Sequence, residues 1–253
     1  MTVFVLKLIA MTTMLVDHVG STFFDDAFWM RAVGRLAFIT YAFLIAESYC
    51  HLKNKPDRLR VHVVKLLALF LVAEIPHDIV LSGDLLEFSQ QNAIGDLGLG
   101  FLALILQGWT TRAFRNRRAY AVPFNVAIFV AAFVASYLIK SEYAGSGVVL
   151  VEAFYLYLQR ADSWRLPARM AALTAICALF LAALIWTFFG FRDFSGTVSM
   201  TRYVPLWMTG SFLPVVPLAF YNRKLGYHSR WFNWFYSVFY PLQFILIIMA
   251  GLI

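Results

Sequence analysis

Residues 3–24 read VFVLKLIAMTTMLVDHVGSTFF, an apolar run of the length that crosses a lipid bilayer as one helix. Ionisable side chains interrupt this run at only three positions, Lys7, Asp17 and His18. The run lacks both a basic leading segment and a small-residue cleavage site, so we expect a retained helix rather than a signal peptide. Runs of the same kind recur along the chain and decide the fold.

The composition of the 253 residues supports a membrane protein. Hydrophobic residues make up 61% of the chain and charged residues 14%, whereas soluble domains contain about 45–50% and about 25%. Only helices and closed barrels satisfy the backbone inside lipid, and continuous apolar runs favour helices. We therefore predict an all-α fold, a polytopic membrane helix bundle that forms a single domain over residues 1–253.

Nine membrane-spanning helices are predicted. They cover residues 3–24, 29–50, 61–81, 92–110, 120–139, 145–158, 167–189, 202–221 and 232–253. The sixth is short for a span of about 17–25 residues, so a tilted, broken or re-entrant segment is an alternative there. Totals of eight or ten spans also stay open.

Basic residues gather in every second loop. These four loops carry 14 of the 21 Lys and Arg residues, at Lys53, Lys55, Arg58, Arg60, Arg112, Arg115, Arg117, Arg118, Arg160, Arg165, Arg169, Arg223, Lys224 and Arg230. The positive-inside rule places such loops in the cytoplasm, which predicts the N-terminus inside and the C-terminus outside. This pattern accounts for the net charge of +7, so no nucleic-acid partner is predicted. A second interpretation is that one of these loops binds a phosphorylated cytosolic co-substrate such as coenzyme A.

Ionisable residues inside the predicted helices indicate a functional site, because each costs about 2.5–3.5 kcal/mol at membrane depth. A rise of about 1.5 Å per residue puts them in one layer of the outer half of the bilayer, with Glu74 nearest the midplane. The layer contains Asp17, His18, Arg35, Glu74, His77, Asp78, Asp96 and Glu152. For any single member, an interhelical hydrogen bond or a buried ion pair is the competing explanation.

At these same residues the sequence resembles the TraX family of membrane acyltransferases, named for a protein that acetylates the N-terminus of a conjugative pilin. The resemblance is carried by LKLIAMTTMLVDHVG at 6–20, GRLAF at 34–38 continuing to Glu47, EIPHD at 74–78, Asn92 with Gly98 and Gly100, and FYPL at 239–242. It is thin between about 105 and 230. Ile39 stands where the family usually has proline, and Gln243 where it usually has histidine. If that histidine is catalytic in relatives, this protein is altered or inactive.

The resemblance implies an acyltransferase in the bacterial inner membrane, with cytosolic acetyl-CoA as co-substrate. The implied acceptor is an amine, such as a pilin or peptide N-terminus, or a hydroxyl of a glycan, on the outer side. Tyr240 of the FYPL motif, together with Glu74, Asn92, Asp96 and Glu152, is predicted to bind substrate. No metal site is predicted.

Catalytic roles are predicted for Asp17, His18, Arg35, His77 and Asp78. An N-terminal amine has a pKa of about 7.7–8.0 and a histidine about 6.5, so we expect His18 to act as general base. Asp78 or Glu74 is expected to orient His18, because adjacent helical residues project about 100° apart and Asp17 is badly placed. His77 is the rival base or a proton-passing residue.

Arg35 is expected to be held by a carboxylate, with Asp17 the first candidate because both lie at one depth on consecutive helices. Two other function classes remain open. Carboxylates and histidines at membrane depth also suit a proton-coupled transporter or flippase, although the ionisable cluster before residue 100 has no second copy. An inactive membrane scaffold is the third hypothesis.

Overall fold

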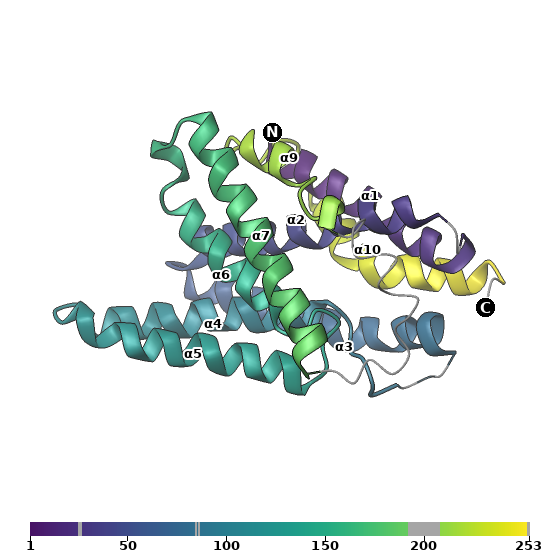
Figure 1. The fold of residues 1–253 in the computed structure, drawn as a ribbon, viewed down its shortest axis with the longest axis horizontal. Helices are drawn as coiled ribbons and strands as arrows, with labels where there is room; N and C mark the ends of the chain where they lie inside the picture. Colours follow the sequence, from purple (N-terminus) through teal and green to yellow (C-terminus); the bar gives the residue numbers. More distant parts are fainter. Residues whose placement is uncertain (25–26, 84, 86, 192–207, 252–253) are drawn as a thin grey trace.

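The computed structural model describes residues 1–24, 27–83, 85, 87–191 and 208–251, and over these residues the protein is helical, with no strand (Figure 1). The helices are α1 (Val3–Phe23), α2 (Phe28–Leu52), α3 (Pro56–Ser82), α4 (Ile94–Ala113), α5 (Arg118–Leu138), α6 (Ser146–Leu158), α7 (Leu166–Phe191), α9 (Val215–Ala219) and α10 (Arg230–Met249), with a 3-10 turn η1 (Ala161–Ser163). An isolated bridge joins Gln91 to Ser141. The prediction of an all-α fold is confirmed.

Local sequence explains several helix ends. Thr2 and Ser229 cap α1 and α10, because their hydroxyls accept hydrogen bonds from the Val5 and Phe232 amides. Helix α3 begins five residues earlier than predicted, with Pro56 at its first position, where the missing amide hydrogen costs nothing. The predicted span 202–221 lies partly outside the described residues, and its described part contains helical residues 208–210 and the five-residue helix α9.

Six of the described helices are long and apolar enough to cross a membrane: α1, α2, α4, α5, α7 and α10. Helix α3 is long but carries more ionisable residues, and α6 has 13 residues. The side chains of Val122, Val126, Val130 and Val134 on α5 are 44–60% exposed. An apolar face of this size needs lipid or another apolar cover, and the protein is accordingly a multi-pass membrane protein.

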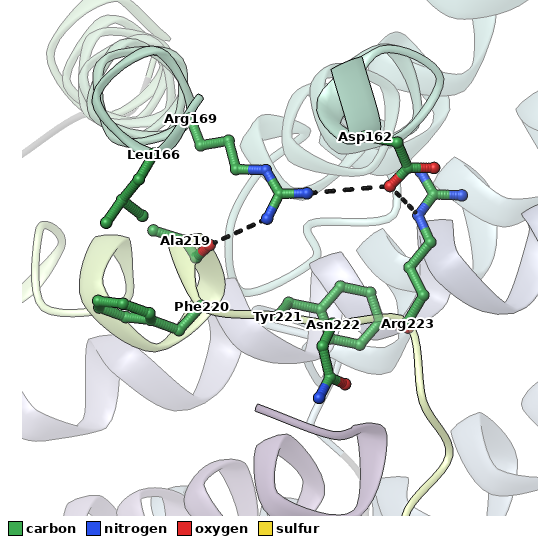
Figure 2. A pocket seen from close by; sticks show the side chains of 8 residues that line it. All are labelled: Asp162, Leu166, Arg169, Ala219, Phe220, Tyr221, Asn222 and Arg223. Atoms are coloured by element: carbon green, nitrogen blue, oxygen red, sulfur yellow. Dashed lines mark hydrogen bonds and ion pairs between the residues drawn. The ribbon is translucent and has the colours of Figure 1, made fainter. Parts of the chain in front are cut away.

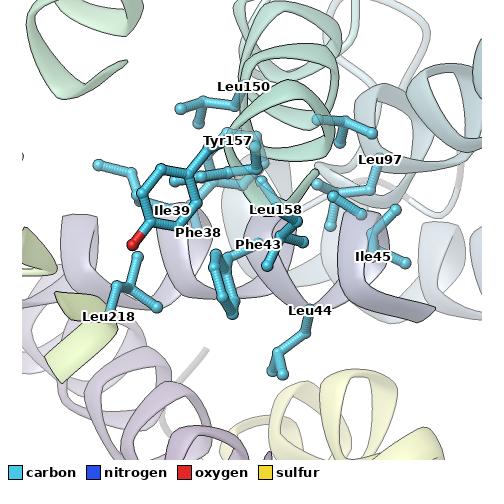
Figure 3. Packing of buried hydrophobic residues seen from close by; sticks show 14 of the residues in the cluster. Phe38, Ile39, Phe43, Leu44, Ile45, Leu97, Leu150, Tyr157, Leu158 and Leu218 are labelled. Atoms are coloured by element: carbon cyan, nitrogen blue, oxygen red, sulfur yellow. The ribbon is translucent and has the colours of Figure 1, made fainter. Parts of the chain in front are cut away.

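The core lies along the middle of α2. Phe38, Ile39 and Phe43 of this helix are at most 5% exposed, and Figure 3 shows them between residues of α4, α6 and α9. Short helix α6 is buried because α2, α4 and α7 all pack against it. On the other side of α2 lies α1, while α10 packs against α3. This arrangement brings the two ends of the chain to one side of α2.

Candidate functional site

Asp17 on α1 faces α2. Its carboxylate Oδ1 lies 2.9 Å from Arg31 Nη1, and the residue is only 9% exposed. The close approach of the two helices depends on Gly34, where an added Cβ would overlap the Asp17 carboxyl group. The segments 6–20 and 34–38, which carry the family resemblance, are therefore in direct contact through Asp17 and Gly34.

Arg35, one turn after Arg31, makes a different contact from the one predicted. Its Nη1 donates a hydrogen bond of 3.0 Å to the Tyr143 hydroxyl, and its guanidinium lies 5.3 Å from the Tyr143 ring centre. The expected ion pair with Asp17 is formed by Arg31 instead. Arg31 and Arg35 share one helical face. The orientation of α2 about its axis places Arg31 beside the Asp17 carboxylate.

His18 faces α10, because its side chain projects about 100° away from that of Asp17. Its ring packs 4.4 Å from the Phe244 ring, and Tyr240 and Gln243 lie beside it. Gln243, at the position where the family usually has histidine, is 2% exposed. The FYPL motif at 239–242 thus lies next to His18, although the two are far apart in the sequence.

The three residues Glu74, His77 and Asp78 lie on one face of α3, as their spacing predicted. His77 Nδ1 is 3.3 Å from Asp78 Oδ1, and the two residues are each 2% exposed. The carboxylate of Asp78 thus contacts the neighbouring His77. The orientation of His18 by Asp78 or Glu74 stays a prediction.

Asn92 holds Glu74 in place. Its amide Nδ2 donates to Glu74 Oε2 and, at 3.0 Å, to the Phe70 carbonyl, while its Oδ1 accepts from the Ile94 amide at 3.0 Å. The Asn92 side chain is fully buried and is already fully engaged. Asn92 therefore positions Glu74, and its contact with substrate stays a prediction.

Several polar atoms between α1, α3 and α10 lack a partner. His18 Nδ1, Glu74 Oε1, His77 Nε2, the Tyr240 hydroxyl and both polar atoms of the Gln243 side chain are buried without a hydrogen bond of normal geometry from the described residues. A buried unsatisfied polar atom costs about 1–3 kcal/mol, and such atoms are rare in native proteins. We call His18, Glu74, His77, Asp78, Tyr240 and Gln243 the polar cluster.

Asp96 does not belong to the polar cluster. Its carboxylate is fully buried and accepts four hydrogen bonds, from the hydroxyls of Ser136 and Ser141 and from the amides of Tyr143 and Gly145, the last two at 3.0 Å. The Asp96 carboxylate thus joins α4 to the end of α5 and to the loop between α5 and α6. Its contact with substrate stays a prediction.

Glu152 also lies elsewhere. Its Oε1 accepts a hydrogen bond of 2.5 Å from Gln107, which is 11 residues beyond Asp96 and so about 16 Å further along α4. Glu152 lines an open pocket of about 990 Å³ that also includes Lys53, Arg112 and Tyr155. The depth calculation placed Glu152 in the outer layer, but the structure puts it near the basic loops.

The loop between α5 and α6 adds two residues that the sequence did not single out. Tyr143 bonds to Arg35, and Glu142 acts electrostatically on His77, Arg35 and Asp17. Burial raises the pKa of Glu142 above its ordinary value. The sequence offers no local signal for these roles, because they depend on how the loop folds back over α2.

The basic loops meet at one end of the molecule. Arg112 Nη2 donates a 2.6 Å hydrogen bond to the Lys53 carbonyl, which joins the loops after α2 and α4. Figure 2 shows a pocket of about 510 Å³ where Asp162 lies between Arg169 and Arg223, at 3.9 and 2.8 Å. This clustering agrees with the prediction that these loops lie on the same side of the membrane.

Comparisons with known proteins agree with the motifs. The model of the TraX protein family matches residues 3–251. The probable fimbrial assembly protein FimC, serogroup H1, of Dichelobacter nodosus is 29% identical over 259 residues, which cover 98% of this chain and 94% of that protein. No solved structure matches this chain.

Proposed function

Because the chain belongs to the TraX family, we propose that it is a membrane acyltransferase that modifies a subunit of a pilus or fimbria. The donor is acetyl-CoA from the cytoplasm, and the acceptor is an N-terminal amine or a hydroxyl on the outer side of the inner membrane. The similarity to a fimbrial assembly protein supports this biological context. The choice of acetyl as the transferred group follows from the resemblance to the TraX family.

The observation that carries the proposal is the set of unpartnered polar atoms in the polar cluster. They come from α1, α3 and α10, and they include two imidazole nitrogens, one each on His18 and His77. A substrate amide or amine that enters between these helices would satisfy atoms that otherwise cost free energy. The cluster therefore has the chemical groups of a binding and proton-transfer site.

In the proposed reaction the acceptor nitrogen attacks the thioester carbonyl carbon, the new C–N bond forms and the C–S bond breaks. His18 accepts the proton that the amine loses, and the coenzyme A thiolate leaves and is protonated. His18 suits this role because its Nδ1 is buried beside Tyr240 and Gln243 without a hydrogen bond of normal geometry from the described residues. Arg31 neutralises Asp17, so that carboxylate supports the α1–α2 contact.

The donor needs cationic groups at the cytoplasmic side. Arg112 and Lys53 line the pocket of about 990 Å³ that contains Glu152, and arginine and lysine are the usual partners of phosphate oxygens. The basic end thus offers a suitable entrance for a phosphorylated donor.

The test is acetyl transfer by purified protein. Release of the coenzyme A thiol and the mass of the acceptor are measured with acetyl-CoA and three acceptors: a pilin-type peptide with a free N-terminus, the same peptide blocked, and a glycan. We expect His18→Ala to lower the rate about 10²–10⁴-fold. His62→Ala is the matched control, since His62 is a histidine of α3 whose ring lies 4.8 Å from Phe101, away from the polar cluster.

The outcomes separate the hypotheses. Loss of activity in His77→Ala with full activity in His18→Ala would transfer the base role to His77, whose contact with Asp78 also suits a base. Full activity in both variants would contradict an acyltransferase site in the polar cluster. Solute transport by the protein without thioester consumption would favour a transporter.

A further inference from the structure

The polar cluster contains a group of side chains with the composition of a metal site. One ligand atom each of Glu74, His77 and Asp78 can be chosen so that the three lie within 4.8 Å of one another. They come from a single turn of α3, so the backbone of one helix sets their spacing. His77 is 98% buried and its Nε2 has no hydrogen bond from the described residues.

Each carboxylate is held at one oxygen by a donor outside the group. Asn92 donates to Glu74 Oε2, and the Glu87 amide donates to Asp78 Oδ2 at 2.9 Å. Glu74 Oε1 remains without a hydrogen bond from the described residues, and Asp78 Oδ1 lies 3.3 Å from the His77 ring. Outer donors that fix the orientation of carboxylates are a regular part of metal sites.

Two of the three side chains are carboxylates four residues apart on one helix, and like charges at this spacing repel each other. A charge that lies in an apolar bundle also needs a partner. One divalent cation between the two carboxylates would meet both requirements.

We propose that Glu74, His77 and Asp78 bind a divalent metal ion, with Zn²⁺ the first choice. One imidazole and two carboxylates form a mixed nitrogen and oxygen set, which suits zinc, whereas magnesium and calcium prefer oxygen alone. Tetrahedral zinc with ligand bonds of about 2.0–2.1 Å needs ligand atoms about 3.3 Å apart.

This site goes beyond the proposed acetyl transfer and does not depend on it. It revises the prediction, made from the sequence, that the protein holds no metal. Three protein ligands leave a further position for water or a substrate oxygen, as in catalytic rather than structural zinc sites. His77 is then a ligand, which leaves His18 as the histidine able to accept a proton.

The experiment measures metal content directly. The full-length protein, purified in detergent with a tag free of histidine, is stripped with a chelator, reloaded with Zn²⁺ and analysed by elemental mass spectrometry. We expect about one zinc ion per wild-type chain. Glu74→Gln and His77→Gln should each weaken zinc binding at least tenfold, while the matched controls Glu152→Gln and His62→Gln should keep the wild-type stoichiometry.

Wild-type protein gives a readout that needs no variant. Reloading with Co²⁺ should produce the visible absorption bands of a cobalt ion bound to protein ligands, and Zn²⁺ should raise the thermal unfolding temperature. A wild-type chain that takes up neither metal, or zinc retained in both cluster variants, overturns the proposal. Zinc bound by a protein that acetylates no acceptor would support this site and contradict the proposed function instead.

Discussion

Gly34 allows α1 and α2 to pack closely because it has no side chain. An added Cβ there would overlap the carboxyl group of Asp17, which pairs with Arg31. The glycine therefore sets how closely α1 can approach α2, and the aspartate is held in the space that a side chain would occupy. The first two motifs of the chain work as one packing unit.

Gly34→Ala should destabilise the protein by about 1–3 kcal/mol, because Asp17 must move and its contact with Arg31 is lost. The control is Gly98→Ala in α4, where an added Cβ meets no atom within 4 Å. That change should be neutral or slightly stabilising, as expected for alanine inside a helix. Thermal unfolding in detergent measures both, and equal unfolding temperatures for the two variants would contradict tight packing at Gly34.

The buried carboxylate of Asp96 connects α4 to the loop before α6. Four donors converge on it, and removing it strands all of them in an apolar interior. This tie also places Tyr143, which in turn bonds to Arg35. Asp96 thus acts on the polar site through the loop that it holds.

Asp96→Ala should lower the free energy of unfolding by about 3 kcal/mol or more, since each stranded buried donor costs about 1–3 kcal/mol. Thermal unfolding and amide hydrogen exchange over residues 139–146 are the measurements. Glu152→Gln, which changes a carboxylate in an open pocket, should cost much less. An Asp96→Ala protein of wild-type stability that fails to use the acceptor would contradict this structural role and favour the predicted role of Asp96 in substrate binding.

The sequence predicted the helices well because apolar length is a local property. It also placed Glu74, His77 and Asp78 on one face, since helical spacing alone fixes that. Depth was predicted less well, because Glu152 on the short helix α6 lies near the basic loops and not in the outer layer, and the rotation of one helix against another was not predictable. Asp96 was therefore assigned to the polar site although it bonds to a loop, and Arg35 was assigned the partner that Arg31 has.

Across the whole molecule, loop charge and structure agree on which loops share a side. Figure 1 shows the α4–α5 and α6–α7 connections toward the left and the C-terminus at the right. The hydrogen bond from Arg112 to the Lys53 carbonyl brings the loops on either side of α3 and α4 together. If α4 crosses the membrane, α3 must therefore cross it too, although its hydropathy is diluted by Lys65, Glu74 and Asp78.

Reporter fusions after Lys55, Arg117 and Arg165 should therefore all report the cytoplasm, and a fusion after Ser89 should report the outer side. The positive-inside rule gives the direction, with the N-terminus inside. Each fusion keeps all the helices that precede it, so the four fusions serve as controls for one another. An outer-side signal at any of the first three positions would contradict the predicted topology.

The meeting of α1 with α10 has a consequence for biosynthesis. His18 leaves the ribosome among the first residues, but Tyr240, Gln243 and Phe244, which surround it, are translated more than 220 residues later. At roughly 5–20 residues per second, His18 waits on the order of 10–45 s for its neighbours. A nascent chain can thus insert most of its helices while the polar cluster stays unassembled, and a message cut short before its last helix codes for a protein without Tyr240 and Gln243.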